Sequence, residues 1–454
     1  MNTATGSSRA KKPAGDSRSV GLWPAAALVI GHTIAVGIFL TPAELIGALA
    51  SPPLTLALWT GCALLVIAGA FTFGELASRF PVGGGPYIYL REAWGPRMAF
   101  LYGWQSMLVM DPGVTAALAA GLAEYVVLLS PAAAGMERWI AVAAIWMLAL
   151  VSMAGLTLSA RVLGIMTAFK LAAFAVVVVL AFASGEGSWT HFARPATADG
   201  GRSAEAIAIG LVSIFFSFGG FWEASRIAGE VRHASRTMPA ALALGVATVT
   251  LVYLATTAAF IYLVPAQQAT SAAEFARRAG VAMAGANGPA LLAWIVILSV
   301  VASALALLIM APRLYVAMGA DGLFPRALAA VHPMTGTPVR ATLLLAVLAS
   351  AFVSAGSFAE IVAFFMCTTL GFVALAAGGL FVVRRRGPEG AFATPGYPVT
   401  PALFVLFVTA VVVLVAANRP WQAAAGLGVI LLGFPAYRLF SRAAPARPVS
   451  RLMP

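Results

Sequence analysis

The stretch 30–45 reads IGHTIAVGIFLTPAEL and lies inside the first long apolar run of the chain. Two glycines, a histidine, a threonine and a proline interrupt a segment that would otherwise form a continuous membrane helix. A bilayer offers no hydrogen-bonding partner to an open backbone group, so a break is tolerated only where it is buried in protein or lines a wet cavity. The stretch therefore predicts a binding site within a membrane protein.

The composition supports a membrane protein. Of 454 residues, 61% are hydrophobic and 10% are charged, whereas soluble domains carry roughly 25% charged residues. The two cysteines lie in apolar runs and the four histidines are scattered, so the sequence predicts no disulfide framework, no metal site and no cofactor.

The apolar runs predict an all-α membrane protein with 12 transmembrane helices, because a span needs about 20 apolar residues. The predicted spans are 21–48, 54–79, 97–130, 138–157, 160–183, 205–229, 239–264, 288–318, 339–356, 359–383, 400–417 and 420–440. Residues 1–19 are polar and basic, which predicts a disordered cytoplasmic tail. A cleavable signal peptide is the alternative, but the apolar run that follows is too long for one.

The basic residues predict the orientation, since Lys and Arg concentrate in cytoplasmic loops. With the N-terminus inside, 21 of the 28 lie on the cytoplasmic side, Arg226 among them, and six lie outside. Only Lys170 falls within a span. Both termini are then cytoplasmic in the cell inner (plasma) membrane, and the net charge of +12 needs no nucleic acid as a partner.

A second break is predicted five spans after the first, at SFGG (217–220) in the sixth span. Two interrupted helices at this spacing are what an inverted five-plus-five repeat would show. The repeats would cover 20–183 and 184–383, followed by two extra C-terminal helices at 384–440 and a cytoplasmic tail at 441–454.

The two breaks leave backbone N–H and carbonyl groups without partners. The helix that follows a break presents free N–H groups, and the helix that precedes it presents free carbonyls. An α-amino acid carries a carboxylate and an ammonium, which match these two ends. We expect the N–H groups of Thr33, Ile34, Ala35, Val36 and Gly37 to hold the carboxylate. The ammonium is assigned to carbonyls of two groups of residues: Ile30 and Gly31, and Phe216, Ser217, Phe218 and Gly219. Phe216 could also close over a substrate. Glycines that merely permit close helix packing are the alternative.

Four motifs resemble the amino acid–polyamine–organocation superfamily of secondary transporters. GHTIAVGIF (31–39) is similar to its first-helix pattern, and GELASRFPVGGGPYIYLREAWGP (74–96) to the loop after helix two. AGEVRHASRTMPAA (228–241) and RLYVAMGADGLFP (313–325) resemble its loops after helices six and eight. The resemblance implies a LeuT-like fold with discontinuous helices 1 and 6. It also implies a pocket walled by helices one, three, six, eight and ten.

The first break and the loop after helix six, where His233–Ser235 replace Asn-Pro-x, depart from the superfamily pattern. Ala35 and Val36 replace a glycine and a small polar residue, so a methyl group narrows the carboxylate site and a hydroxyl is lost. FSFGGFWEAS (216–225) and GADGLFP (319–325) also resemble arginine/agmatine exchangers. Those exchangers carry an aromatic residue where this chain has Leu307, which argues against arginine as the substrate.

Lys170 is the strongest candidate for a coupling group, because an ionisable residue at depth is costly and by default functional. By resemblance, its ammonium would lie against the first break in place of a sodium ion, near Ser299 and Ser303. A lysine held at this depth could exchange a proton near neutral pH. An ammonium that reaches out to the interface is the alternative.

Other ionisable residues remain open. Glu223 resembles an acidic residue that some exchangers use for their pH response, and it is the second coupling candidate; solvation in a vestibule would equally explain it. Asp111 could pair with substrate or with another charge, and His32 could titrate near neutral pH or be a core histidine. Glu75 and Glu230 fall at cytoplasmic helix ends, where ion pairs with Arg79 or Arg232 are expected.

The sequence therefore predicts a secondary active transporter, not an enzyme, that moves amino acids by alternating access as a proton symporter, exchanger or uniporter. Its partners would be an amino acid, a possible proton and the lipid bilayer. A carrier of polyamines or other organic cations is the main alternative, and it would need Asp111 and Glu223 in the site. No nucleophile–base pair or phosphate loop suggests an enzyme, and a channel would not need paired breaks.

Overall fold

The structure is a computed structural model that describes residues 20–35, 37–49, 51–193, 204–265, 272–355, 358–387 and 390–442. The predicted tails at 1–19 and 441–454 lie outside these residues, apart from the last two residues of the final helix.

The described chain is helical almost throughout. Its α-helices are α1 (Leu22–Thr33), α2 (Gly37–Leu49), α3 (Pro52–Arg79), α4 (Pro86–Trp94), α5 (Pro96–Gln105), α6 (Asp111–Leu129), α7 (Glu137–Met153), α8 (Leu156–Ala183), α9 (Ala204–Phe218), α10 (Ala234–Leu263), α11 (Ala272–Ala284), α12 (Gly288–Ala320), α13 (Arg326–Ala329), α14 (Val339–Ala355), α15 (Phe358–Arg386), α16 (Val399–Asn418) and α17 (Pro420–Arg442). Shorter helices of other types are η1 (Ser106–Met110), η2 (Pro131–Ala133), η3 (Trp189–Phe192), η4 (Phe221–Glu230) and η6 (Gly285–Asn287).

Each of the 12 predicted spans corresponds to one of these helices or to a consecutive group of them. Nine helical segments of the described residues are long and apolar enough to cross a membrane. The other three predicted spans contain no helix of that length. The first is divided into α1 and α2, whereas α7 and α14, the fourth and ninth spans, have 17 residues each. The 12-span count is thus supported only in part by length.

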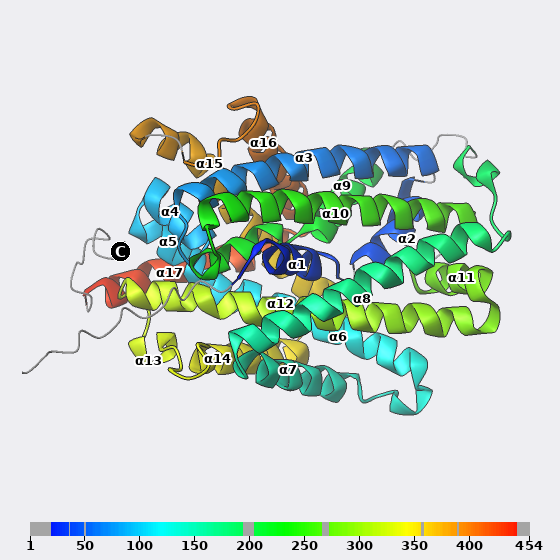
Figure 1. Ribbon diagram of the computed structural model, residues 1–454, viewed down its shortest axis with the longest axis horizontal. Helices are drawn as coiled ribbons and strands as arrows, with labels where there is room; N and C mark the ends of the chain where they lie inside the picture. The colour runs from blue at the N-terminus through cyan, green and yellow to red at the C-terminus, as the bar shows by residue number, and fades with distance from the viewer. Residues whose placement is uncertain are drawn as a thin grey trace, which may run out of the picture.

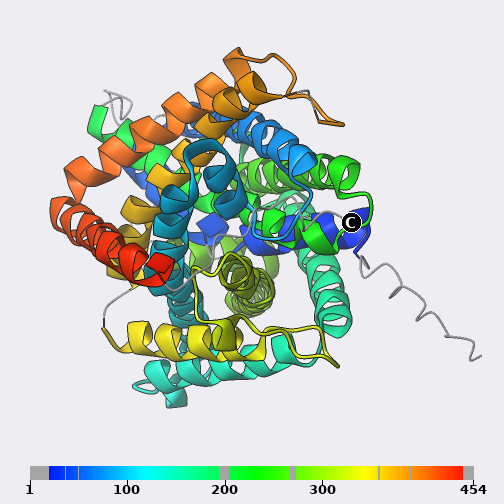
Figure 2. The same ribbon diagram turned by 90° about the vertical axis from the view of Figure 1, so that its left-hand side faces the viewer.

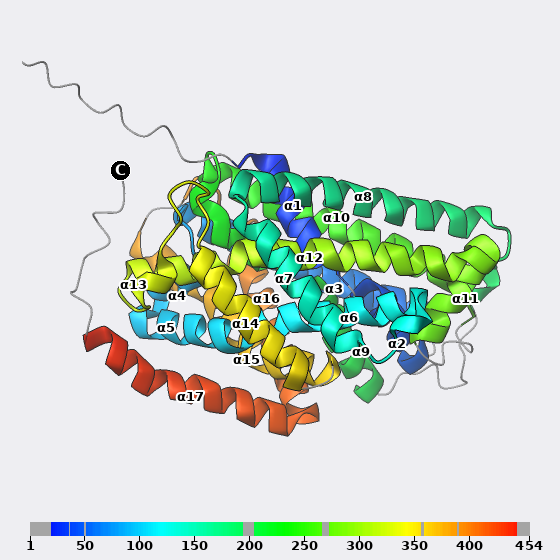
Figure 3. The ribbon, with the colours of Figure 1, turned by 90° about the horizontal axis from the view of Figure 1, so that it is seen from below.

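The helices form one bundle around α12. The helices run mainly along the long axis of the bundle (Figure 1), and the end-on view places α12 near the middle of the others (Figure 2). In the most apolar stretch of the segment that contains α12, 78% of the residues are buried within the protein. In the corresponding stretch of α17, only 11% are buried. Accordingly, α17 lies along the outside of the bundle (Figure 3).

Both predicted breaks are present. Helix α1 ends at Thr33 and α2 begins at Gly37, while α9 ends at Phe218 and the chain continues after Gly220 as the 3₁₀ helix η4. Gly220 has φ = 94°, a conformation that favours glycine. The two breaks approach closely, because a Cβ at Gly37 would lie 2.8 Å from the Ser217 hydroxyl.

The third span is interrupted as well, by the π-helix η1 between α5 and α6. Pro112 supplies the local reason: it has no N–H, and its ring would clash with the carbonyl four residues earlier. A π-bulge relieves that clash, and such bulges are frequent at functional sites. The distortion brings Met110 to the edge of the cavity described below.

The bundle end that carries α4 is tied together by ion pairs. Arg91 of α4 contacts Asp321 at 2.7 Å, and Arg313 contacts Glu230 at 3.2 Å. Glu75 pairs with Arg79 as predicted, and also with Arg384 of α15 at 2.6 Å. Asp321 holds the pKa of the Arg91 guanidinium above its usual range, although burial acts in the opposite direction.

Candidate functional site

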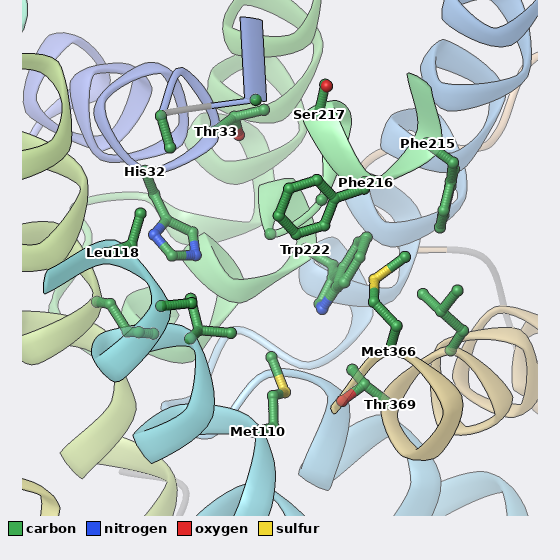
Figure 4. A pocket seen from close by; sticks show the side chains of 18 residues that line it. His32, Thr33, Met110, Leu118, Phe215, Phe216, Ser217, Trp222, Met366 and Thr369 are labelled. Atoms are coloured by element: carbon green, nitrogen blue, oxygen red, sulfur yellow. The ribbon is translucent and has the colours of Figure 1, made fainter. Parts of the chain in front are cut away.

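A cavity of about 80 Å³ lies between the two breaks (Figure 4). It is walled by the first, third, sixth, eighth and tenth spans, the set that the resemblance implied. Its lining residues are His32, Thr33, Ala35, Gly37, Met110, Val114, Ala117, Leu118, Phe215, Phe216, Ser217, Gly219, Gly220, Trp222, Leu307, Met366, Thr369 and Leu370. A buried water needs roughly 10–15 Å³, so this volume corresponds to about five waters, which is the scale of a small organic molecule.

The predicted binding residues divide into two groups. The cavity is lined by Thr33, Ala35, Gly37, Phe216, Ser217 and Gly219. Ile30, Gly31, Ile34 and Phe218 are buried but do not line it, and Val36 lies outside the described residues. The backbone near the breaks therefore approaches the cavity, although Ile34 and Phe218, which also lie at the breaks, are not part of its lining.

The cavity wall is mainly apolar, and its described lining residues include no Asp, Glu, Lys or Arg. Two buried hydroxyls in the wall, Thr33 Oγ1 and Thr369 Oγ1, have no hydrogen-bonding partner among the described residues. Figure 4 shows them on different elements around the cavity. Because buried polar groups are normally paired, these two hydroxyls are candidates for contact with a ligand.

Two helix ends meet at the cavity. Helix α2 begins at Gly37, so its first N–H groups lack partners within the helix, and α9 ends at Phe218, where the last carbonyls are similarly open. The Ser217 hydroxyl lies 2.7 Å from that of Thr41, which joins α9 to α2. An anion is favoured at the first of these ends and a cation at the second.

Tyr253 of α10 connects the breaks from behind. Its hydroxyl lies 2.9 Å from the Thr33 carbonyl and 2.8 Å from the Ser217 carbonyl, so it can donate its hydrogen to either. The Phe216 carbonyl accepts from the Gly219 N–H at 2.9 Å. Some carbonyls at the end of α9 therefore already have one donor, and each keeps a second lone pair.

Lys170 of α8 lies at the first break, on the side away from the cavity. Its side chain is fully buried and does not reach toward an interface. The Nζ group donates to the Gly31 carbonyl at 2.9 Å, to the Ile34 carbonyl, and to the Ser303 hydroxyl at 3.2 Å. Ser303 also donates toward the Gly31 carbonyl, at 2.7 Å, so this carbonyl has two donors near its two lone pairs.

Ser299 and Ser303 of α12 complete the same group. The Ser299 hydroxyl lies 3.0 Å from the Ile34 carbonyl, and Ser303 lies 2.8 Å from it. Every acceptor of Lys170 among the described residues is therefore neutral: two peptide carbonyls and one hydroxyl. The ammonium lies against the first break, the place that the resemblance implied for it.

A second buried charge follows the other break. Arg226 of η4 is fully buried, and its guanidinium contacts Asp111 Oδ1 at 2.9 Å and also contacts Glu223. Tyr315 donates to Asp111 at 2.8 Å, and Tyr102 accepts from Arg226 at 3.0 Å. Asp111, Glu223, Arg226, Tyr102 and Tyr315 form what we call the Arg226 cluster.

This cluster corrects two expectations. Arg226 was counted among the cytoplasmic loop arginines, yet it is fully buried between η4, the third span and α12. Glu223 is also fully buried, so solvation in a vestibule does not explain it, and Asp111 pairs with another charge. A run that reads as a loop in the sequence is here the continuation of a broken helix.

Most of the cavity wall was not predicted from the sequence. His32, considered as a titrating group or a core histidine, lines the cavity, and its Nδ1 lies 3.4 Å from the Ser303 carbonyl. Trp222 stands beside the break in FGGFWEAS, so its proximity to the break was a usable signal. Met366 and Thr369 of α15 carry no such signal, because nothing in an apolar run shows which face of a helix looks inward.

Comparison with known proteins now adds an independent finding. Residues 20–432 match the family model described as amino acid permease, and the chain therefore belongs to that family. It is 25% identical to the human cystine/glutamate transporter over 93% of this chain and 85% of that one. It is 26% identical to the human b(0,+)-type amino acid transporter 1, over 93% and 88% of the two chains. The serine/threonine exchanger SteT of Bacillus subtilis is 25% identical over 86% and 89%. The chain is thus a multi-pass membrane permease and not an enzyme.

Proposed function

We propose that this permease moves small neutral amino acids across the membrane by alternating access. The observation that carries the proposal is the cavity between the start of α2 and the end of α9, with no charged side chain in its described wall. A zwitterion suits such a site, because one helix end favours its carboxylate and the other favours its ammonium.

We assign the carboxylate to the N–H groups at the start of α2, beside Ala35 and Gly37, with the Thr33 hydroxyl as a further donor. The ammonium is assigned to the carbonyls at the end of α9, from Phe216 to Gly219. Gly31, also considered for the ammonium, is left out because Lys170 and Ser303 already occupy its carbonyl. Phe216 lines the cavity next to this end and remains our proposed gate.

The wall indicates the substrate's side chain. Met110, Leu118, Leu307 and Met366 suit a short apolar group, and Thr369 offers a hydroxyl that lacks a partner among the described residues. A serine, threonine or alanine side chain fits both the small volume and this mixed wall. Relatives named as a cystine/glutamate transporter and a serine/threonine exchanger support amino acids as the substrate class.

Lys170 is our proposed coupling group. Its ammonium holds the two carbonyls of the first break from behind, so loss of its proton would loosen the backbone that faces the cavity. Proton coupling and exchange both fit this arrangement. Glu223 remains the second coupling candidate, since the two carboxyl groups of the Arg226 cluster share a single arginine and could retain one proton between them.

The membrane arrangement is part of the proposal. We propose both termini in the cytoplasm of a cell whose inner membrane holds the protein, with inverted repeats at 20–183 and 184–383. Two pairs of elements support the repeat: the breaks in the first and sixth spans, and the short fourth and ninth spans of 17 residues each. Lipid surrounds the bundle, and nucleic acid has no role.

The organic-cation carrier is less well supported. That function needs carboxylates in the cavity, and the two candidates, Asp111 and Glu223, instead contact Arg226 behind the wall. A polyamine would find only neutral groups among the described lining residues.

Uptake into proteoliposomes tests the proposal. Labelled serine, threonine, alanine, arginine, glutamate and putrescine would be compared with and without an inward proton gradient, and with amino acid loaded inside. Wild type would be compared with Lys170→Ala and with the matched control Ser159→Ala. Ser159 is also buried on α8 but donates to backbone carbonyls near the start of that helix.

We expect uptake of the small neutral amino acids, stimulated by the gradient or by internal amino acid, and loss of that stimulation in Lys170→Ala alone. Transport of putrescine without any amino acid would overturn the zwitterion site. Stimulation that survives in Lys170→Ala would leave the site in place and remove Lys170 from coupling.

A further inference from the structure

An apolar groove runs along the outer surface of the bundle, and it shares no lining residue with the cavity. It has a volume of about 550 Å³ and lies between α15 and α16, where Leu375, Phe381 and Val405 form its walls. Leu375 is 38% exposed and Trp94, at its edge, is 44% exposed. Gly378 lies in the groove, and a Cβ at this position would meet no heavy atom within 4 Å.

The length of the groove matches one leaflet of a bilayer. Its lining residues on α15 run from Ala374 to Arg386, which at 1.5 Å per residue is about 18 Å. Half of a typical hydrocarbon core is roughly 15 Å. Trp94 stands at the Leu375 end of this run and donates to the Leu375 carbonyl at 2.9 Å, whereas Arg385 and Arg386 lie at the other end.

A second, smaller hollow continues from the opposite end of the groove, at Arg386. It has a volume of about 390 Å³, and its lining includes Ser78, Arg79, Glu92 and Arg386. Arg386 lines both hollows and is fixed at their junction, because it donates to the Glu92 carbonyl at 2.7 Å at the end of α4. An apolar groove one leaflet long thus leads into a basic hollow.

The charges of the two hollows favour an anion. Arg385 and Arg386 are both exposed, and neither forms an ion pair within the described part of the chain. The acidic residue nearby, Glu92, pairs with Arg91 at 3.0 Å. Basic groups at the mouth of a groove between membrane helices are suited to anionic lipid headgroups.

We propose that these two hollows form a binding site for an anionic phospholipid. One acyl chain lies in the groove over Gly378, and the phosphate lies against Arg385 and Arg386. The site is separate from the cavity and does not depend on the proposed transport function.

Native mass spectrometry of the full chain, released from detergent with added lipid, tests the site. The probes are phosphatidylglycerol and phosphatidylcholine with identical acyl chains. The site variants are Arg385→Gln, the double variant Arg385→Gln/Arg386→Gln, and Gly378→Leu, which fills the groove. The matched controls are Arg161→Gln, an exposed arginine on α8, and Gly61→Leu, where a Cβ also meets nothing within 4 Å.

We expect wild type to retain phosphatidylglycerol more strongly than phosphatidylcholine. Each arginine removed should weaken phosphatidylglycerol by about fivefold, Gly378→Leu should weaken both lipids, and neither control should change retention. Equal losses in Arg161→Gln would mean attraction to any basic surface and would overturn the site. So would unchanged binding in the site variants, or displacement of the lipid by glycerol phosphate alone. A wild-type dimer that Gly378→Leu abolishes without lipid would reassign the groove to a second copy of the chain.

Discussion

The two buried cations of this permease, Lys170 and Arg226, are held in opposite ways. Lys170 lies behind the first break and donates to two carbonyls and a hydroxyl, all neutral. Arg226 follows the second break and contacts two carboxylates. Both side chains are fully buried, so the difference lies in their partners and not in their exposure.

The comparison separates a proton-exchanging role from a structural one. An arginine stays charged in proteins. Removing one partner of a buried ion pair destabilises the folded protein, because the other charge is then buried without compensation. A lysine can give up its proton, and neutral acceptors do not oppose that loss as a carboxylate would. We therefore assign coupling to the Lys170 site and attachment of η4 to the third and eighth spans to the Arg226 cluster.

Removing Arg226 should have the largest effect on stability. Arg226→Met leaves Asp111 and Glu223 buried without their cation, which should lower the free energy of unfolding by about 3–5 kcal/mol. Unfolding in detergent micelles measures the change. The triple variant Arg226→Met/Asp111→Asn/Glu223→Gln removes every charge together and should recover much of the loss. A triple variant no more stable than the single one would contradict charge pairing as the cause.

Lys170→Met should cost less stability but more coupling. The Gly31 and Ile34 carbonyls keep their serine donors, so we expect a loss of about 2 kcal/mol, equivalent to two hydrogen bonds. Gradient-driven uptake should fall to the level measured without a gradient. If this variant lost as much stability as Arg226→Met, the two cations would not differ in the way proposed.

Ser303→Ala tests whether the contact between Ser303 and Lys170 is needed for coupling. Ser303 contacts Lys170 and the Gly31 carbonyl, whereas Ser299 contacts only the Ile34 carbonyl among these groups. We expect a loss of about 1 kcal/mol and weaker gradient stimulation in Ser303→Ala. Ser299→Ala is the matched control, expected to lose similar stability with normal stimulation. Equal effects on stimulation would mean that contact with the lysine is not what matters.

Glu230→Gln should have the smallest effect, because this ion pair reaches water. Its side chain is 27% exposed and lies 3.2 Å from Arg313. Pairs in contact with solvent contribute about 0–1 kcal/mol, so we expect a change below about 1 kcal/mol that shrinks further in high salt. A loss comparable with that of Arg226→Met, measured by the same unfolding assay, would contradict this prediction. Burial would then not explain how much each arginine–carboxylate contact contributes to stability.

Much of the fold could be predicted from the chain. Each predicted span corresponds to one of the helices described or to a consecutive group of them, because an apolar run long enough to cross a bilayer is a local property. The breaks at 31–37 and 217–220 were equally readable, since glycine in a membrane helix is a local signal as well. The fourth span was predicted to reach residue 157, but α7 ends at Met153, because hydropathy does not show where the last hydrogen-bonded turn closes.

The site was less predictable. Thr33, Gly37 and Ser217 line the cavity, because each lies within or directly beside a break. Thr369 and Met366 were not found, since the register of the tenth span against the breaks is set by packing. Tyr253, which lies behind both breaks, was missed for the same reason.

By itself the sequence determined a helical membrane permease with two opposed breaks and a lysine at depth. Hydropathy, glycine positions and the family motifs are local properties of contiguous residues, so they can be recognised without knowledge of the packing. Only the tertiary structure decided that Arg226 is buried against Asp111, 115 positions away, and that Lys170 instead meets neutral carbonyls. Which helices pack together determines the partner of a buried charge, and we propose that Lys170, with its neutral acceptors, is the cation that exchanges a proton.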